Sequence, residues 1–398
     1  MTNEYKNLKT IDPEAWKLVV AETERQAKDL TLIASENYAS PAVLEALGSP
    51  LNNKYSEGYP GKRYYPGNEI VDKIEILACQ RAKQLFGAEH ANVQALSGGP
   101  ANLAIYAALL KPGDKIMGAK LAHGGHLSHG HKVNFSGQLY QQIGYELDAN
   151  GKFDMKAIAA LAKKEKPTLI VAGFSAYSRD IDWAGFRTIA DSVKAYLLAD
   201  ISHTASLVAT GLLNNPVKYA DVVMFTTHKS FWGPRGAVIL CKKALADTID
   251  RAIFPGFQGG PHDNNIAGIA IAMKEASTPK FKTYTKQVVA NAKTLAEALI
   301  KLDYKIVSGG TDNHLMVVDL TNKNITGKEA EQALASQGIL ASRSTIPNDP
   351  RGPFNPSGIR LGTYAATTRG LKTKDIQNLA KLIDDILTNN KPTSPAGR

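Results

Sequence analysis

The sequence predicts an α/β fold, with a mainly parallel sheet flanked by helices and a smaller α+β domain after it. Short apolar runs such as residues 167–173 (PTLIVAG) and 236–241 (GAVILC) are typical of strands that are buried on both faces. They alternate with amphipathic segments such as residues 69–86, which have the periodicity of helices. This alternation indicates parallel strands that are joined by helices.

The elements of the larger domain follow a helical arm, which residues 13–29 predict by their periodicity. A strong amphipathic helix comes next at residues 69–86. Further strands are expected at residues 90–96, 114–119, 167–173, 195–200, 220–225 and 236–241, and further helices at 101–110 and 182–194.

The last third of the chain has a different pattern, which predicts the smaller α+β domain. It begins with a long helical region at residues 264–303, so we expect the domain boundary in that region, near residue 280. The later strands are expected at 304–309, 314–320 and 358–363, and the later helices at 328–338 and 374–390. The chain is thus divided into an arm (1–30), a large domain (31–280) and a small domain (281–398).

Length and composition are those of a cytoplasmic protein with more than one domain. The chain has 398 residues, which is too many for one simple core, and 43% of them are hydrophobic. No apolar run approaches the ~18 residues that a membrane span needs, and the charged N-terminus has no signal-peptide core. Only Cys79 and Cys241 are present, so a disulfide framework or a cysteine metal site is not expected.

The net charge of +10 does not by itself identify a partner. The lysines are scattered and no basic stripe interleaved with aromatic residues is present, which favours a solvated surface over a specific nucleic-acid site. A site for a small polyanion remains open.

Polar residues occur where two predicted strands end. Asp200 closes residues 195–200, His203 follows it, and Lys229 follows residues 220–225. Ligands of open α/β sheets bind at the carboxyl ends of the strands, so Asp200 and Lys229 are expected on one rim. They either form a salt bridge or hold a cofactor, because pyridoxal phosphate requires a lysine for its aldehyde and an acid for its pyridine nitrogen.

A short glycine turn offers a place for a phosphate group. Ser97, Gly98 and Gly99 lie between a predicted strand and a helix that Pro100 is expected to begin. Thr226 adds a hydroxyl group, and Gly259-Gly260 offers further backbone amides. Many βα loops look like this turn, so the turn alone is weak evidence.

Several long stretches, in the right order between about residues 32 and 370, resemble the serine hydroxymethyltransferase family. That family consists of pyridoxal-phosphate enzymes of fold type I, so the resemblance implies a seven-stranded, mainly parallel sheet. The stretches are LIASENYASPAVLEALGSPLNNKYSEGYPGKRYY, KLAHGGHLSHGHKVNFSGQLY, FSAYSRDIDW, ADISHTASLVATG, TTHKSFWGPRG, FPGFQGGPH and SGIRLGT.

The resemblance implies roles for individual residues. Pyridoxal phosphate would be held covalently by Lys229, with Asp200 on its ring nitrogen, His126 stacked on the ring, and Ser175 and His203 near the ring hydroxyl. The remaining cofactor contacts would be Ser97, Gly98, Gly99, Thr226, Tyr55 and Gly260. The catalytic residues would be Lys229, Glu57, His228 and Tyr65.

Substrate contacts follow from the same resemblance, with L-serine as one substrate and tetrahydrofolate as the other. The substrate carboxylate would be bound by Arg360 and Ser35, with Glu57 and Tyr65 from the neighbouring subunit of a homodimer or a tetramer. The folate residues would be Leu121, Gly125, His126, Leu127, Gly352, Pro353 and Phe354.

Without the family resemblance, the same residues also allow simpler interpretations. The histidine-rich loop around His126 could be a metal site, although its spacing matches no usual zinc pattern, and no metal is expected. Arg360 could be a surface arginine, and residues 53–65 could form a surface Ω-loop.

The chain also departs from the usual family pattern at several positions. Gly99-Pro100 replaces Ser-Gln at the phosphate turn, which removes a hydroxyl donor and an amide hydrogen. Ser342-Arg343-Ser344 and Gly352 fall on the expected folate side, and Trp232 and Tyr364 are also unusual. A folate-independent aldolase or transaldolase, a modified pterin acceptor, and a basic binding protein that has kept the fold are therefore the alternatives.

Overall fold

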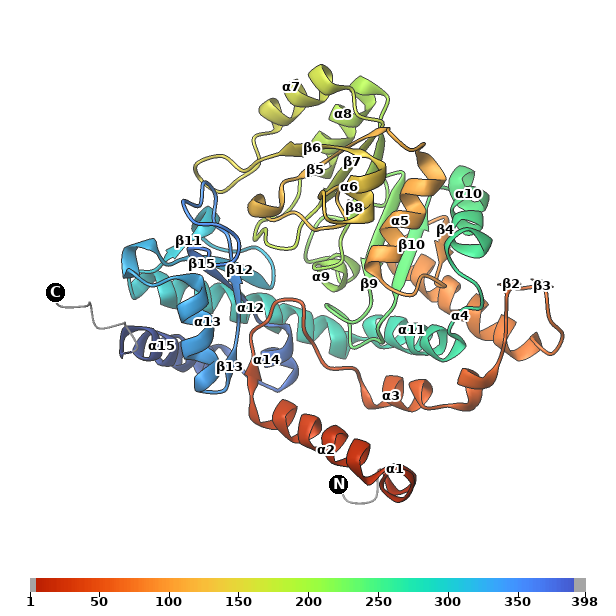
Figure 1. Cartoon of the computed structure of the whole chain (residues 1–398), viewed down its shortest axis with the longest axis horizontal. Coiled ribbons are helices and arrows are strands. Elements are labelled where there is room, and N and C mark those ends of the chain that lie inside the picture. Colours follow the sequence, from red (N-terminus) through yellow and green to blue (C-terminus); the bar gives the residue numbers. More distant parts are fainter. Residues whose placement is uncertain (1–4, 390–398) are drawn as a thin grey trace.

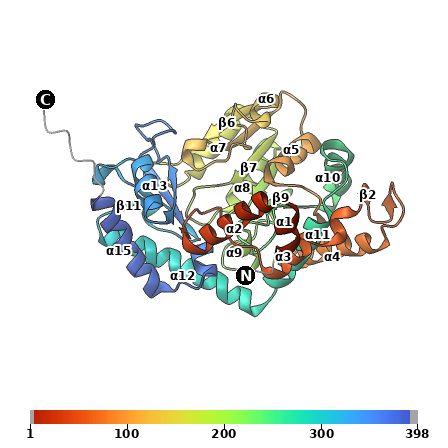
Figure 2. The same cartoon turned by 60° about the horizontal axis from the view of Figure 1, so that its bottom comes forward.

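The computed structural model describes residues 5–389, which form a large lobe and a small lobe (Figure 1). The N-terminal helices α1 (Lys6–Ile11) and α2 (Pro13–Lys28) bury none of their own side chains, and Figure 2 brings them to the front. Within the described span, no helix is long and apolar enough to cross a membrane. Residues 1–4 of the predicted arm and 390–398 of the predicted small domain lie outside the described residues.

The large lobe is built on a seven-stranded sheet in the order β4-β10-β9-β8-β7-β5-β6. Only β10 runs in the direction opposite to the other six strands, which confirms the predicted mainly parallel α/β fold. Its strands are β4 (His90–Asn92), β5 (Lys115–Ala119), β6 (Gln141–Tyr145), β7 (Leu169–Gly173), β8 (Tyr196–Asp200), β9 (Val222–Thr226) and β10 (Ala237–Cys241). Strand β6 was not predicted, because it lies at the sheet edge and buries only Tyr145.

Helices cover both faces of this sheet, because alternate strand side chains point to opposite sides. Ile170 and Leu197 share one core with helices α4, α8 and α11, whereas Leu169 and Leu198 share another with α5 and α10. The helices of this lobe are α3 (Pro41–Leu47), α4 (Glu69–Phe86), α5 (Gly98–Leu109), α6 (Phe135–Leu139), α7 (Met155–Glu165), α8 (Trp183–Val193), α9 (Ala205–Ala209), α10 (Ala246–Arg251) and α11 (Asp263–Ala276).

The start of α5 differs from the prediction. The helix begins at Gly98, so Pro100 is its third residue rather than its first. Pro100 is still tolerated there, because the backbone N–H groups of a first helical turn have no partner within the helix.

The small lobe is built on an antiparallel sheet in the order β11-β12-β15-β14. Side chains of α12, α13 and α15 form a core with β12 and β15, as expected of an α+β arrangement. Its elements are α12 (Pro279–Lys301), β11 (Lys305–Ile306), β12 (Leu315–Asp319), α13 (Gly327–Ser336), β13 (Ile339–Leu340), β14 (Ser342–Ser344), β15 (Gly358–Gly362), α14 (Tyr364–Thr368) and α15 (Thr373–Asn389).

Helix α12 connects the two lobes. Its first half contributes Phe281 and Val288 to a core of the large lobe, and its second half contributes Ala292 and Leu299 to the core of the small lobe. The predicted single helical region is in fact two helices, because α11 ends at Ala276 and α12 begins at Pro279. The predicted boundaries of the arm (1–30), the large domain (31–280) and the small domain (281–398) stay predictions.

Candidate active site

The carboxyl ends of the large-lobe strands surround a cavity of about 220 Å³. Asp200 is the last residue of β8 and Thr226 the last of β9, and these neighbouring strands are parallel. The structure therefore brings Asp200 and Lys229 to one rim, as predicted from the strand ends. The cavity is lined by Ser97, Gly98, Gly99, Asn102, His126, His129, Phe174, Ser175, Asp200, Ser202, His203, Met224, Thr226, His228, Lys229 and Arg235.

Asp200 is buried, with only 9% of its surface exposed, and is held by four hydrogen bonds. Its Oδ2 lies 3.0 Å from Nε2 of His129 and accepts from Nδ2 of Asn102 at 3.1 Å. Its Oδ1 accepts from the backbone N–H and the hydroxyl of Ser202. Burial alone would raise the pKa of this carboxyl, but the bond and charge of His129, the charge of Lys229 and the Ser202 bond hold it below its usual value. Asp200 is therefore an ionised carboxylate that faces the cavity.

Lys229 follows β9 and is largely enclosed. Burial lowers the pKa of its amine, and the positive charges of Arg360 and Arg235 lower it further, against the opposing effect of Asp200. Within residues 5–389 no hydrogen bond or ion pair engages its Nζ atom. An amine of this kind is more easily deprotonated than a surface lysine and can act as a nucleophile.

Three predicted histidines lie around the cavity in their neutral form. Burial lowers the pKa of His126 to about 4 and that of His228 to about 4, and it holds that of His203 well below its usual value. Nearby positive charges, of which Lys229 is common to all three, act in the same direction. Neutral imidazoles can stack on a ring or accept hydrogen bonds without adding charge beside Lys229.

The glycine turn presents open backbone to the cavity. Ser97 caps α5 without using its own hydroxyl within the helix, and a Cβ on Gly99 would meet no atom within 4 Å. In contrast, a Cβ on Gly98 would lie 2.8 Å from Cγ2 of Thr226, so only glycine fits there without a shift. The Oγ1 of Thr226 is buried with no hydrogen-bond partner among the described residues. A free helix N-terminus and an unsatisfied hydroxyl together suit an anion.

Arg360 lies on β15 and reaches from the small lobe toward the large one. Burial lowers the pKa of its guanidinium to about 10, so the group is still charged at neutral pH. Its Nη1 donates to the carbonyl of Ser175 at 2.5 Å, and no carboxylate of the described chain pairs with it. A buried cation without an anion is costly, and a carboxylate ligand would relieve that cost. Ser35 is half-buried beside this strand, where the backbone N–H of Gly362 donates to the carbonyl of Leu32.

A wider cleft of about 760 Å³ opens beside the cavity, and Ser175 lines both spaces. Among the predicted folate residues, Leu121, Gly125 and Pro353 line this cleft, together with Arg360 and β14. The others do not line it: His126 lines the smaller cavity, and Leu127, Gly352 and Phe354 line neither. The side chain of Phe354 is 86% exposed.

Tyr55, Glu57 and Tyr65 do not line the cavity around Lys229. They lie on one loop with the rings of Tyr55 and Tyr65 in edge contact at 5.1 Å, and both rings are exposed. The loop packs beside Gly259 and Gly260: a Cβ on Gly259 would lie 3.1 Å from Oε1 of Glu57, and one on Gly260 would lie 3.4 Å from the Tyr55 ring. Within one chain, the predicted site residues Tyr55, Glu57, Tyr65 and Gly260 thus form a group that is separate from the cavity around Lys229.

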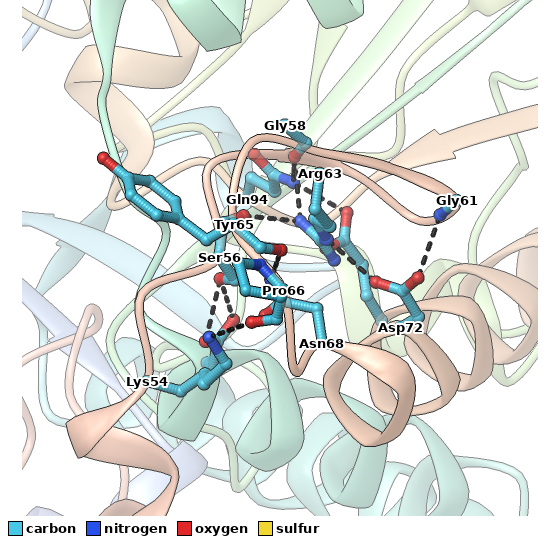
Figure 3. Close-up of polar contacts among 12 residues, drawn as sticks. Lys54, Ser56, Gly58, Gly61, Arg63, Tyr65, Pro66, Asn68, Asp72 and Gln94 are labelled. Carbon is cyan, nitrogen blue, oxygen red and sulfur yellow. Dashed lines mark hydrogen bonds and ion pairs between the residues drawn. The ribbon is translucent and has the colours of Figure 1, made fainter.

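The loop is held rigidly by Arg63, whose side chain is only 4% exposed (Figure 3). Its Nη1 donates to the carbonyls of Ser56 and Gly58, the residues on either side of Glu57, at 2.7 and 2.8 Å. Its Nε and Nη2 bind the carboxylates of Asp72 and Glu75, both on α4. Figure 3 shows the Tyr65 ring pointing away from this cluster. The backbone of the predicted Ω-loop is thus fixed from inside, while the rings of Tyr55 and Tyr65 are exposed.

Sequence reasoning missed His129, Asn102 and Ser202, which hold Asp200. His129 stood in the same histidine-rich loop as His126, but sequence spacing could not show which imidazole meets the carboxylate. Among residues 5–389, no group of three or more His, Cys, Asp or Glu side chains could hold a metal ion.

Comparison with known proteins agrees with this geometry. The model of the family "Serine hydroxymethyltransferase" matches residues 8–383. The chain belongs to the serine hydroxymethyltransferase family. A serine hydroxymethyltransferase of Legionella pneumophila (strain Corby) is 56% identical over 392 residues, covering 98% of this chain and 94% of the relative. One of Desulfotalea psychrophila is 54% identical over 378 residues, covering 95% and 89%. The serine hydroxymethyltransferase family has the fold-type I architecture predicted from the resemblance.

The residues around the cavity fit the pyridoxal phosphate that this family uses. The ionised Asp200 suits a protonated pyridine nitrogen, and the buried Lys229 amine suits an aldehyde. Thr226 and the first turn of α5 suit a phosphate. These groups converge on one cavity.

Proposed function

We propose that the cavity around Lys229 is the active site of a pyridoxal-phosphate-dependent glycine hydroxymethyltransferase. The reaction reversibly transfers the hydroxymethyl carbon of L-serine to tetrahydrofolate and gives glycine and 5,10-methylenetetrahydrofolate. The observation that carries the proposal is that a largely enclosed lysine without an ion-pair partner among residues 5–389 and a buried, ionised aspartate line one cavity at the ends of adjacent strands, in a chain of this family.

The residues at the strand ends bind and orient the cofactor. Lys229 is assigned as its covalent anchor and Asp200 as the acceptor that keeps a proton on the ring nitrogen. When bound, pyridoxal phosphate supplies an electron sink for the charge left on the substrate α-carbon. The other assigned contacts are His126 on the ring face, Ser175 and His203 near the ring hydroxyl, His228 beside Lys229, and Ser97, Gly98, Gly99 and Thr226 at the phosphate.

Arg360 and Ser35 are assigned to the carboxylate of L-serine. Arg360 brings a buried, unpaired guanidinium to the border of the two spaces, and such a group binds a carboxylate strongly because both partners are charged. This contact would hold the substrate where the two spaces meet. Oriented binding of this kind contributes to rate by holding the reacting atoms together.

Tyr55, Glu57, Tyr65 and Gly260 are assigned to the active site of a second subunit in a homodimer. Their separation from Lys229 within one chain supports this assignment, and the clamp on both sides of Glu57 presents its carboxylate at a defined position. Glu57 would take the proton of the serine hydroxyl as the carbon–carbon bond breaks, and Tyr65 would contact the substrate. Association beyond a dimer stays a prediction.

Tetrahydrofolate is assigned to the wider cleft. Leu121, Gly125 and Pro353 line it, which supports their predicted folate contacts. His126, Leu127, Gly352 and Phe354 would have to contact parts of the folate that extend beyond that lining. The unusual Ser342-Arg343-Ser344 forms β14 along the cleft, so these residues would contact the acceptor directly.

The cellular setting is inferred from the sequence. We infer a cytoplasmic location from the similarity to bacterial serine hydroxymethyltransferases. We expect no specific binding to nucleic acid, because the positive residues are scattered along the chain.

The test is the formation of glycine from L-serine by the purified protein, with and without tetrahydrofolate. We expect visible absorbance from bound pyridoxal phosphate and glycine formation that depends on tetrahydrofolate. Lys229→Ala should lose both the covalent attachment and the turnover. Equal glycine formation without tetrahydrofolate would instead identify a folate-independent aldolase.

A further inference from the structure

Three buried rings form a stack behind the cavity. The ring of His203 lies 5.6 Å from that of His314 at an interplanar angle of 21°, and His314 lies 4.1 Å from Tyr364 at 27°. Their exposed fractions are 5%, 0% and 1%. His203 belongs to the large lobe and lines the cavity, whereas His314 precedes β12 and Tyr364 begins α14 in the small lobe. The stack therefore joins the two lobes directly at the active site.

His314 has a fixed tautomer. Its Nε2 lies 3.1 Å from the carbonyl of Ala34, which can only accept, so Nε2 carries the hydrogen and donates it. Its Nδ1 is buried with no hydrogen-bond partner in the described chain. Burial and the charges of Arg360 and Lys229 lower its pKa to about 3, so the ring stays neutral. A neutral ring can lie against His203 without charge repulsion.

Tyr364 closes the other side of the stack. Its hydroxyl donates to the carbonyl of His203 at 3.0 Å and accepts from Oγ of Ser206 at 3.3 Å. Its own carbonyl accepts from the hydroxyl of Tyr284 at 3.2 Å. Tyr364 thus holds the backbone of His203, while His314 holds its ring.

We propose that His314 and Tyr364 are positioning residues, which together set the ring of His203 and the chain segment that carries Ser35. This inference rests on the proposed function, because His203 and Ser35 are assigned there to the cofactor and to the serine carboxylate. Neither His314 nor Tyr364 lines the cavity, so each acts through another residue.

The physical reason lies in how the two contacts of His314 are arranged. One face of its ring fixes the plane of His203, and its N–H fixes the carbonyl directly before Ser35. A change in this one ring should therefore disturb the cofactor side and the carboxylate side of the site together. Preorganised contacts of this kind determine how well substrate and cofactor are aligned.

The experiment separates these two contacts in the pyridoxal-phosphate-loaded enzyme. His314→Phe keeps a ring against His203 but cannot donate to Ala34, so we expect the KM for L-serine to rise about 5-fold, the worth of one neutral hydrogen bond, with kcat almost unchanged. His314→Leu also removes the ring, so kcat should fall and the pH midpoint of the visible absorbance of bound cofactor should shift. Tyr364→Phe, which keeps its ring, should change that midpoint less than His314→Leu does.

The control is Tyr304→Phe, at a buried tyrosine elsewhere in the small lobe. This change removes the hydroxyl that donates to Oδ1 of Asp384 at 2.9 Å. It should lower the Tm without changing the serine KM or the absorbance midpoint. The inference is overturned if His314→Phe and His314→Leu lower the Tm but leave both readouts at the parent values, since the stack would then be only structural. A parent enzyme without cofactor absorbance would remove the proposed function itself, and this inference with it.

Discussion

At the scale of single residues, the site depends on three buried charges that are not equally satisfied. Asp200 has four hydrogen bonds, whereas Arg360 has one carbonyl partner and Lys229 has no hydrogen bond within the described chain. Removing an ion from water costs several kcal/mol unless partners replace the water. The unpaired cations are therefore the groups whose partners are expected to come from ligands.

Arg360 gives the clearest prediction at this scale. In Arg360→Ala we expect the KM for L-serine to rise roughly 30-fold or more, because loss of one member of a buried charge pair costs at least about 2 kcal/mol. Arg360→Lys should fall between the parent and Arg360→Ala, since lysine keeps the charge but loses the planar fork.

Steady-state kinetics measure this effect, with Arg369→Ala as the matched control. Arg369 is an exposed arginine nine residues further along, whose guanidinium binds the carbonyls of Ala27 and Asp29. Its removal should leave the serine KM within about 2-fold of the parent value. An equal rise in both variants would show that Arg360 does not bind the substrate carboxylate.

At the scale of elements, the first turn of α5 shows how little the helix start depends on one side chain. Ser97 provides no side-chain cap, Gly98 fits against Thr226, and Pro100 sits at the third helical position. The turn therefore offers backbone N–H groups and open space rather than side-chain donors. This supports a phosphate contact that relies on the helix N-terminus.

Two serine substitutions in this turn should have opposite effects on cofactor affinity. Gly99→Ser places a hydroxyl in open space, so the Kd for pyridoxal phosphate should fall about 5-fold by one added hydrogen bond. Gly98→Ser places a Cβ 2.8 Å from Cγ2 of Thr226, so Thr226 must move and the Kd should rise. Absorbance titration of the apoprotein measures both, and the same direction of change in the two variants would contradict this account of the turn.

At the scale of the whole molecule, the predicted active-site residues form two groups on one chain. One surrounds Lys229, and the other lies on the loop of Tyr55, Glu57 and Tyr65, beside Gly260. A symmetric dimer in which each loop reaches the other chain's cavity would bring the two groups together twice.

Subunit mixing tests this arrangement. Lys229→Ala and Glu57→Gln should each be nearly inactive alone, but a hybrid dimer would contain one cavity with both native residues. Random mixing makes half of the dimers hybrid, so we expect about a quarter of the parent activity per subunit. If both residues serve the same chain's cavity, the mixture will be as inactive as its components.

The neutral histidines predict how the stability of the whole molecule depends on pH. The pKa values of His126 and His228 are lowered from 6.5 to about 4 and that of His314 to about 3, so the unfolded chain binds more protons than the folded one below about pH 6.5. Stability is therefore full above that pH and is lost as the pH falls toward 4. Thermal unfolding of the apoprotein should show a decreasing Tm between pH 6.5 and 4.5, above the range where most carboxylates titrate. A constant Tm across this window would contradict the neutral assignment.

The sequence by itself determined the elements and their chemistry. Apolar runs with the lengths and periods of strands and helices predicted the mainly parallel sheet, because burial on both faces demands such runs. The strand ends placed Asp200 and Lys229 on one rim, since parallel strands share a direction. The motifs carried the family resemblance, and the comparisons confirmed it.

The tertiary structure decided which side chains meet. His129 reaches Asp200 from a distant loop, His314 joins the two lobes behind His203, and Arg63 clamps the backbone around Glu57. The edge strand β6 was not predicted, because it buries only one side chain and its sequence therefore lacks the apolar run of a buried strand. The contacts of His129 and His314 depend on packing between segments far apart in the chain, whereas the Arg63 clamp depends on how one short loop folds back on itself. Local sequence patterns report burial and backbone preference, but they do not specify which buried groups will be neighbours.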